Sequence, residues 1–267
     1  IMHEISPFLA PHPIWHYLKA REAPIHTGTN APQHAELPYS LRNRQMDVNF
    51  WLSRWAQDKT GFHAEQVHSD LLEFAEQWLS SASGGSKKDI LVPLCGKTMD
   101  LVYLAKLGHR VVGVELSDKA AAAVFRQATL SFTQSKQGPF QVFRAQDLDL
   151  EVRVGNFFEL PAEPSFDAVW DRAAMVALDP DRRARYVKHL IQLVRPGGTM
   201  LVNIMDYPQE QMPGPPHAIS FDDLGVAYQA HFQLELLKEQ DQIDDSPKFR
   251  ERGLDRFIVR TSLLTRN

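Results

Sequence analysis

The sequence predicts an α/β protein with a mostly parallel sheet, an antiparallel last strand and helices on both faces. Short apolar runs alternate with segments of helical spacing, and strands separated by helices run parallel through right-handed crossovers. The last two apolar runs have no helix of any length between them, which indicates a closing hairpin. The seven expected strands are 90–94, 110–116, 152–158, 166–170, 199–205, 231–238 and 256–264.

The expected helices follow from apolar spacing and from residues that favour helix ends. Asp47 can cap a first helix, and a left-handed cap at Gly108 can end a later one. A proline and two glycines, residues 196–198, close the helix before the fifth strand. A polar insert at about 131–149 interrupts the alternation. The remaining helices are expected at 64–80, 99–107, 118–130 and 181–194.

The chain is expected to consist of an irregular extension, residues 1–45, and a folded domain, residues 46–267. The extension holds 6 of the 17 prolines and 5 of the 11 histidines, with little periodicity. It is either a partly ordered tail or a wrap that touches the active site. His12 and His16 are four residues apart, but Pro13 lies between them and no third ligand is near, so no metal site is predicted.

Composition and charge exclude several classes of function. Hydrophobic residues at 43% and charged residues at 23% are typical of a globular chain with a full core. A net charge of −4 disfavours nucleic acid or an anionic membrane as a partner. The single cysteine, Cys95, fits a reducing compartment, and neither a secretory signal nor a run of 18 apolar residues is present. We therefore expect a soluble, cytosolic monomer.

The segment after the first predicted strand is a glycine turn that resembles two nucleotide-binding motifs and matches neither. Residues 96–98 (GKT) look like the end of a phosphate-binding P-loop, but the glycine it needs five positions before Gly96 is replaced by Leu91. A dinucleotide-binding G-x-G-x-x-G is also missing, since Leu94 and Met99 occupy two of its glycine positions. Gly96 still lets a ligand approach the backbone closely.

Glu115 ends the second predicted strand, 19 residues after Gly96. A carboxylate at this distance from a glycine turn is typical of a group that binds a ribose diol through two hydrogen bonds. The alternative is a solvated glutamate at the end of a strand, although the preceding residues are apolar. A glycine turn and a strand-end acid without a phosphate cradle indicate an adenosine ligand that lacks pyrophosphate, of which S-adenosylmethionine is the obvious example.

Several ordered motifs then suggest a family. The segments are WLSRWAQDKTGFHAEQVH, PLCGKTMDLVYLAKLGHRVVGVELSD, VWDRAAMVALDP, PGPP and a terminal LLT. Over about residues 46–267 the chain resembles the thiopurine S-methyltransferases. The resemblance implies a Rossmann-like S-adenosylmethionine-dependent methyltransferase fold and direct transfer of a methyl group to the sulfur of an aromatic or heterocyclic thiol, with S-adenosylhomocysteine as product.

Three alternatives stay open at this point. In the first, the chain is a methyltransferase whose acceptor is a small thiol, a halide, or a selenium or tellurium species. In the second, the chain is a non-catalytic module that binds S-adenosylmethionine and uses its extension as an interface. In the third, the chain is a nicotinamide oxidoreductase, an activity that the broken glycine pattern disfavours.

The resemblance also implies a set of site residues. Two tryptophans cover the cofactor, the glycine turn contacts it, Glu115 binds its ribose, and two residues after the third strand enclose its adenine. The implied cofactor contacts are Trp51, Trp55, Leu94, Gly96, Glu115, Asn156, Phe157 and Arg172. Seen alone, the two tryptophans would be read as core packing on one helix face.

Arg172 is the implied catalytic residue, at the junction of cofactor and acceptor, where a guanidinium favours an anionic sulfur. Asp171 beside it either orients it or is structural. The implied acceptor pocket is lined by Phe62, Pro93, Arg172, Pro215, Pro216 and a basic residue, taken as Arg250 although Lys248 and Arg252 are equally placed. Cys95, behind a buried strand, is expected to be an inert thiol.

Overall fold

The computed structural model describes residues 39–61, 63 and 65–267. The chain divides into two units, Ile1–Arg42 and Asn43–Asn267, and the sheet and the candidate site belong to the second. The predicted extension therefore lies outside the described residues except for its last seven positions, and Phe62 lies outside them as well.

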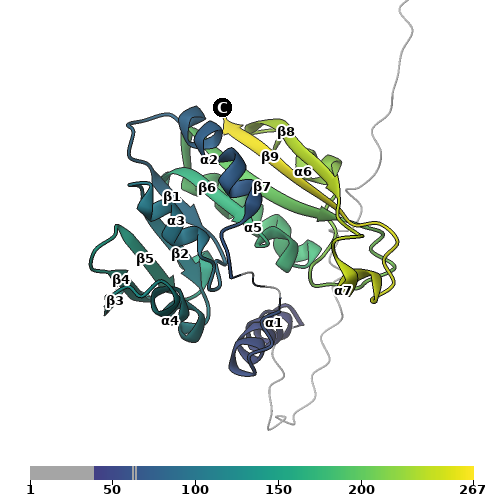
Figure 1. The fold of residues 1–267 in the computed structure, drawn as a ribbon, viewed down its shortest axis with the longest axis horizontal. Coiled ribbons are helices and arrows are strands. Elements are labelled where there is room, and N and C mark those ends of the chain that lie inside the picture. Colours follow the sequence, from purple (N-terminus) through teal and green to yellow (C-terminus); the bar gives the residue numbers. More distant parts are fainter. Residues whose placement is uncertain (1–38, 62, 64) are drawn as a thin grey trace, which may run out of the picture. The chain divides into compact units, whose positions relative to one another are not determined.

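A single sheet runs through this unit with helices on both faces (Figure 1). In chain order the helices are α1 (Tyr39–Ala56), α2 (Ser69–Ser81), α3 (Asp100–Lys106), α4 (Asp118–Gln127), α5 (Pro180–Leu193), α6 (Phe221–Tyr228) and α7 (Pro247–Arg250). The strands are β1 (Asp89–Val92), β2 (Arg110–Glu115), β3 (Phe132–Gln137), β4 (Phe140–Ala145), β5 (Leu150–Val154), β6 (Phe166–Arg172), β7 (Val194–Asp206), β8 (Phe232–Asp241) and β9 (Ile258–Arg266). Two 3₁₀ turns are η2 (Phe157–Glu159) and η3 (Met175–Ala177).

The strand order is β3-β4-β5-β2-β1-β6-β7-β9-β8. Neighbours from β5 to β7 are parallel, and β9 runs antiparallel to both β7 and β8, as predicted. The chain builds the sheet outward from β1 to β2 and then returns to place β6 on the other side of β1. The strand order therefore reverses at the carboxyl ends of β1 and β6, which is where sheets of this kind bind ligands.

All seven predicted strands are present, and the polar insert adds two more. Strands β3 and β4 form a hairpin that pairs antiparallel with β5 at the edge of the sheet. Most side chains of β3 are exposed and polar, so this strand has no apolar run for a sequence pattern to detect.

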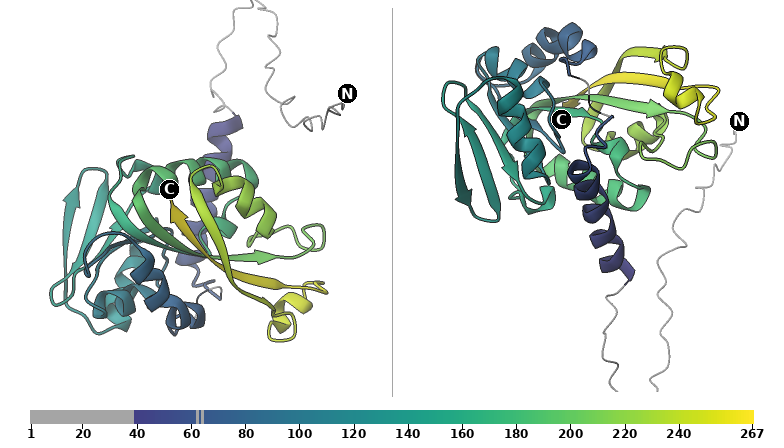
Figure 2. Two further views of the ribbon diagram at one scale, coloured as in Figure 1. Left: turned by 90° about the horizontal axis from the view of Figure 1, so that it is seen from above. Right: turned by 60° about the horizontal axis from the view of Figure 1, so that its bottom comes forward.

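The two faces of the sheet follow from the alternation of side chains along each strand. Ile90 and Trp170 pack with α2, α3 and α4, whereas Leu91 and Val169 pack with α5 and α6. Helices therefore cover both faces of the sheet (Figure 2), which explains the nearly continuous apolar runs of the central strands.

Two predicted boundaries are corrected by the structure, and one helix that was not predicted is present. Helix α1 begins at Tyr39, so the prediction that Asp47 caps it is wrong, because the preceding residues contain no glycine or proline to stop a helix. Strand β5 ends at Val154 rather than at 158, because Gly155 N donates to Glu115 O and the chain then turns into η2. Helix α6, which no apolar pattern indicated, is fixed by a capping box at Ser220. The left-handed cap at Gly108 is confirmed, with φ +95°.

Candidate functional site

The candidate site lies at the carboxyl edge of the sheet, in the turns that follow β1, β2, β5 and β6. The turn after β1 contains two residues with left-handed backbone, Leu94 at φ +46° and Gly96 at φ +57°. Such a conformation is strained for leucine and is typical of functional sites. The predicted inert role of Cys95 agrees with its environment, because the thiol is buried and burial raises its pKa well above the ordinary value.

Gly96 is required by its surroundings as well as by its backbone. A Cβ built on it would stand 2.0 Å from His63 Nε2 and 3.2 Å from Trp55 Cζ2. Trp55 is buried, its ring centroid is 5.1 Å from that of His63, and Trp51, one turn earlier on α1, is partly buried. The structure therefore brings Trp55 and the glycine turn together, and it adds His63, which the sequence did not single out.

Glu115 is buried at the end of β2 and braces the glycine turn. Its Oε2 accepts from Gly96 N at 2.8 Å, and its Oε1 accepts from Ser117 N at 2.9 Å. Burial raises the pKa of this carboxyl, while the backbone N–H groups oppose that rise. Each carboxylate oxygen can accept more than one hydrogen bond, so both retain capacity for a ligand hydroxyl. The structure thus brings Glu115 into contact with the glycine turn, and its contact with a ribose stays a prediction.

Asn156 and Phe157 follow β5 beside Glu115, whose backbone oxygen accepts from Gly155 N at 2.9 Å. Asn156 is exposed, and its Oδ1 accepts from Phe158 N at 3.1 Å. Phe157 is buried, with its ring centroid 5.1 Å from that of Tyr186. Asn156 thus borders the edge, while Phe157 packs beneath it, and their contact with an adenine ring stays a prediction.

Arg172 ends β6 on the face of the sheet that carries α2, α3 and α4. Its Nε is fully buried and has no hydrogen-bond partner among the described residues. Burial lowers the pKa of this guanidinium and the charge of Asp100 opposes that shift, but an arginine stays cationic at neutral pH. A buried cation with an unused donor is prepared for an anionic partner.

Asp171 points to the opposite face and does not orient Arg172. Its Oδ2 accepts from Tyr186 hydroxyl at 2.8 Å and its Oδ1 accepts from Met175 N at 3.2 Å. Complete burial raises the pKa of this carboxyl to about 6. Of the two readings left open by the sequence, the structural one therefore agrees with the contacts, because Asp171 ties η3 to α5.

A buried hydrogen-bonded cluster of Asp100, Trp170 and His68 lies on the same face of the sheet as Arg172. Asp100, the first residue of α3, accepts from Trp170 Nε1 at 2.8 Å and from His68 N at 2.9 Å. Its charge acts on both His68 and Arg172. Sequence reasoning missed Asp100 and His68, because the bonds join residues 70 and 32 positions apart and no spacing pattern reports them.

The predicted acceptor-pocket residues that the structure describes lie at the same edge. Pro93 is buried directly after β1. Pro215 and Pro216 belong to the loop after β7, which is held against η3 because His217 N donates to Val176 O at 2.6 Å. Tyr207 hydroxyl donates to the Pro216 carbonyl and fixes the other side of that loop.

The three candidate basic residues before β9 lie on or next to α7, on the surface. Arg250 is exposed and pairs with Asp244. Lys248 and Arg252 are exposed beside the Phe249 ring, and the charge of Arg252 lowers the pKa of Tyr207, against the rise that burial causes. Arg252 thus acts on the residue that holds Pro216, whereas Arg250 as an acceptor contact stays a prediction.

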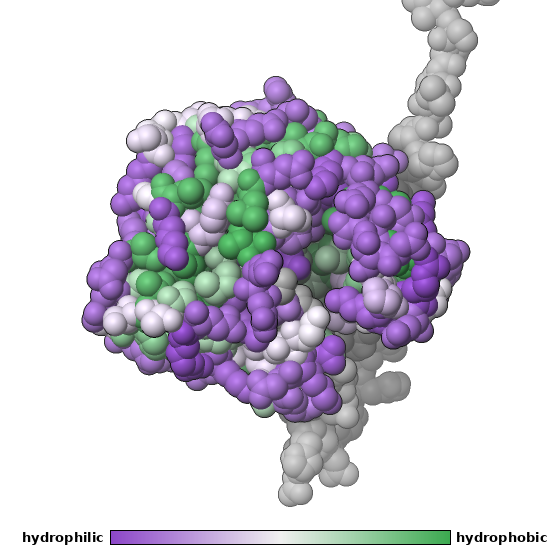
Figure 3. Space-filling view, in the orientation of Figure 1, coloured by the Kyte–Doolittle hydropathy of each residue, from purple (hydrophilic) through white to green (hydrophobic). Residues whose placement is uncertain are grey.

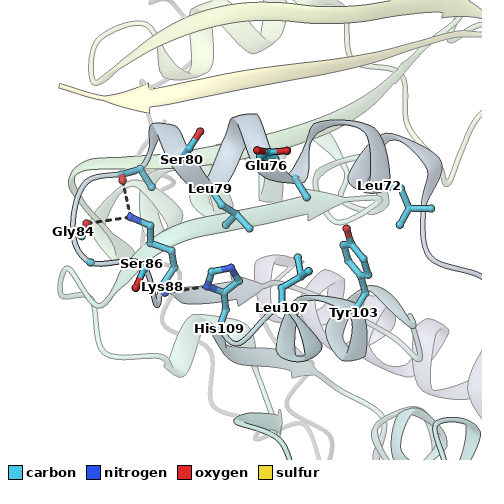
Figure 4. A pocket seen from close by; sticks show the side chains of 13 residues that line it. Leu72, Glu76, Leu79, Ser80, Gly84, Ser86, Lys88, Tyr103, Leu107 and His109 are labelled. Atoms are coloured by element: carbon cyan, nitrogen blue, oxygen red, sulfur yellow. Dashed lines mark hydrogen bonds between the residues drawn. The ribbon is translucent and has the colours of Figure 1, made fainter.

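A groove of about 670 Å³ between α2 and α3 lies at the opposite, amino edge of the sheet (Figure 4). Lys88 and His109, which immediately precede β1 and β2, border it together with Tyr103. Leu72 and Leu107 are 54% and 48% exposed there, and Figure 3 shows apolar surface over these helices. The groove is therefore not the candidate site, which lies at the carboxyl ends of the strands.

Neither a membrane-spanning helix nor a cluster of metal ligands is found among the described residues. Across 39–61, 63 and 65–267, no helix is both long and apolar enough to cross a membrane. In that same part of the chain, no three histidine, cysteine, aspartate or glutamate side chains gather as a metal site would require.

The strand order, the glycine turn and the strand-end acid define the chain as a Rossmann-like methyltransferase. The solved 1,6-didemethyltoxoflavin-N1-methyltransferase of Burkholderia thailandensis, which holds 1,6-didemethyltoxoflavin and S-adenosylhomocysteine, shares the fold at a TM-score of 0.59 and 18% identity, over 89% of this chain and 94% of that one.

Sequence relatives define the family. Residues 46–267 match thiopurine S-methyltransferase. Proteins of that name from Pseudomonas fluorescens SBW25 and Pseudomonas putida KT2440 are 42% identical over 217 residues and 40% identical over 223 residues. These matches cover 80% and 83% of this chain, and 97% and 100% of the relatives. The chain belongs to the thiopurine S-methyltransferase family.

Proposed function

We propose that this chain transfers the methyl group of S-adenosylmethionine to the sulfur of an aromatic or heterocyclic thiol of the thiopurine type. The observation that carries the proposal is the buried Glu115 carboxylate bonded to the Gly96 turn, in a chain of this family. We further propose that residues 46–267 carry the activity, that residues 1–45 are an extension of that domain, and that the chain works as a monomer in the cytosol.

The residues of the turn and strand ends fit an adenosine ligand. Each Glu115 oxygen already accepts one backbone N–H, and its remaining lone pair suits a ribose hydroxyl. The backbone of Leu94 and Gly96 lies at the carboxyl edge of the sheet, Asn156 borders that edge, and Trp55 packs on the turn. Trp51 and Phe157 are the further cofactor contacts that the family resemblance implies.

When bound, S-adenosylmethionine would supply a methyl carbon attached to a sulfonium, and S-adenosylhomocysteine would leave as the thiolate sulfur bonds to that carbon in line. Arg172 supplies the buried cation that favours the thiolate form of the acceptor. Pro93, Pro215 and Pro216 restrict the acceptor to one orientation and exclude water, and such positioning can contribute roughly 7–11 kcal/mol. The chain needs no strong general base for this chemistry, because the acceptor reacts as an anion.

Calorimetric titration with S-adenosylhomocysteine tests the cofactor site. Glu115→Ala should weaken binding about tenfold or more, since a ribose loses a buried charged acceptor. Glu115→Gln should lie between Ala and wild type, because it keeps one acceptor oxygen. Glu159→Gln, an exposed substitution on η2, is the matched control. Unchanged affinity in a folded Glu115→Ala protein would remove Glu115 from the site.

A panel of acceptors with a labelled methyl donor tests the reaction. A thiopurine and other heteroaryl thiols should be methylated faster than a small alkyl thiol, a halide, or selenium and tellurium species. Faster turnover of any of the latter would assign the chain to that acceptor class. Binding of S-adenosylhomocysteine without turnover of any acceptor would indicate a non-catalytic module.

A further inference from the structure

The imidazole of His63 occupies the open side of the glycine turn. A Cβ on Gly96 would stand 2.0 Å from His63 Nε2 and 2.2 Å from its Cε1, and the Trp55 ring packs on the imidazole with centroids 5.1 Å apart. A ligand that reaches the backbone of Gly96 must therefore meet His63. No residue role implied by the family resemblance includes this side chain.

Two cations act on the imidazole of His63. Burial lowers the pKa of His63 to about 4, and the charges of Arg172 from β6 and Lys97 from the turn contribute to that shift. Among the acids of this region, Glu115 at the end of β2 bonds to Gly96 N and Ser117 N, and Asp100 acts on Arg172. At neutral pH the imidazole is thus uncharged in a corner that already holds two cations.

We propose that His63 lines the methyl-donor site and that its neutral imidazole lets the corner beside Arg172 and Lys97 accept a donor that is itself a cation. The inference rests on the proposed function, because S-adenosylmethionine carries a sulfonium and S-adenosylhomocysteine is a neutral thioether at the same atom. A cationic side chain at position 63 would add a third positive charge beside that atom. It would repel the donor and leave the product's sulfur unaffected.

The test compares the Kd of S-adenosylmethionine with that of S-adenosylhomocysteine, by calorimetry without acceptor. In His63→Lys the ratio of the two Kd values should rise about tenfold, as expected for like charges in a partly buried site. In His63→Gln, which is polar and uncharged, the ratio should stay within about twofold of wild type. His231→Lys makes the same change of charge at an exposed position and should not alter the ratio.

The ratio separates a charge effect from a packing effect, since loss of packing weakens both ligands alike. An unchanged ratio in His63→Lys, or an equal rise in His63→Gln, would overturn the inference. If His63→Lys does not fold, His63→Arg serves as the cationic variant under the same criteria. A wild-type protein that binds neither ligand would instead refute the proposed function, so the two failures are distinguishable.

Discussion

At the amino edge of the sheet the buried and bordering charges have hydrogen-bond or ion-pair partners, whereas at the carboxyl edge Arg172 Nε has none among the described residues. Lys88 Nζ donates to the carbonyl oxygens of Ala82 at 2.7 Å and Ser83 at 3.0 Å. Arg195, at the start of β7, bonds to Asp167 at 2.6 Å and to Asp89 at 3.1 Å. These groups hold the strand starts together and have little capacity left for a ligand.

The carboxyl edge has the opposite character. Arg172 Nε and Asn203 Oδ1, which belong to registered residues of β6 and β7, are buried without hydrogen-bond partners among the described residues. Leu94 and Ala173, which lie just beyond β1 and β6, have left-handed backbone at φ +46° and +63°. Unsatisfied polar atoms and strained backbone cost stability, so their presence where the strand order reverses agrees with a surface shaped for binding.

The largest effect should come from removing the cation at the carboxyl edge. Arg172→Ala should lower kcat/KM for an acidic heteroaryl thiol by about 10²–10³-fold, because a preorganised charge-assisted contact is lost. The kcat/KM for a weakly acidic alkyl thiol, corrected for its thiolate fraction, should fall less. The difference between the two losses should be on the order of 1–3 kcal/mol in activation free energy. Steady-state kinetics on both substrates measure the difference.

Two controls separate catalysis from folding in this experiment. The free energy of unfolding should not fall in Arg172→Ala, since the variant removes a buried, incompletely paired cation. Arg195→Ala, at the amino edge, should instead destabilise the protein and leave the kcat/KM of the folded fraction unchanged. Equal loss on both thiols would defeat the role of Arg172 in favouring the anion.

The pH dependence of stability should show a second mark of the carboxyl edge. The pKa of Asp171 is raised by burial from 3.8 to about 6. The folded protein therefore holds this proton to higher pH than the unfolded chain, and its stabilising effect is lost as pH rises from about 4 to about 6. That loss corresponds to about 3 kcal/mol.

Asp171→Asn should lack this contribution, because asparagine does not titrate. Denaturant unfolding of both proteins at pH 4.5, 5.5 and 7 measures it, and the difference between their free energies of unfolding should change with pH in the direction that favours the variant at pH 7. A difference that is constant across this range would mean that Asp171 is ionised throughout.

At the amino edge the expected effect is on stability alone. Lys88→Met keeps the buried alkyl stem but leaves the carbonyls of Ala82 and Ser83 without their charged donor, so the free energy of unfolding should fall by about 2–3 kcal/mol. Affinity for S-adenosylhomocysteine should not change. Lys87→Met, whose pair with Asp149 is exposed, should cost less than about 1 kcal/mol. A Lys88→Met protein that is stable but binds weakly would show that the two edges are not independent.

The same division explains what the sequence could predict. Repeating local patterns predicted all seven parallel-sheet and hairpin strands. The 19-residue spacing marked Glu115 as a ribose ligand, and the structure shows in addition that this carboxylate bonds to Gly96 N. The β3–β4 hairpin was missed because its outer strand is polar and exposed. Local patterns therefore predicted the strands that bury an apolar face and failed for this outer strand, which does not.

Contacts between distant residues were out of reach for a different reason. His63 reaches Gly96 and His68 reaches Asp100 through the tertiary fold, and neither spacing resembles a known motif. The opposite faces of Asp171 and Arg172 could have been predicted, because adjacent strand residues alternate. The resemblance supplied roles for particular residues, but it could not choose among the basic residues of α7 and the turn after it.

That choice gives the smallest expected effect and tests how far the carboxyl edge extends. The Arg250 side chain is 54% exposed and pairs with an Asp244 side chain that is 88% exposed, so Arg250→Ala should change the free energy of unfolding by less than about 1 kcal/mol. Arg252 acts on Tyr207, whose hydroxyl holds the Pro216 carbonyl. Arg252→Ala should therefore raise the acceptor KM a few fold while Arg250→Ala leaves it unchanged. The reverse result would assign the acceptor contact to Arg250 and would mean that the α7 segment moves toward the loop when the acceptor binds.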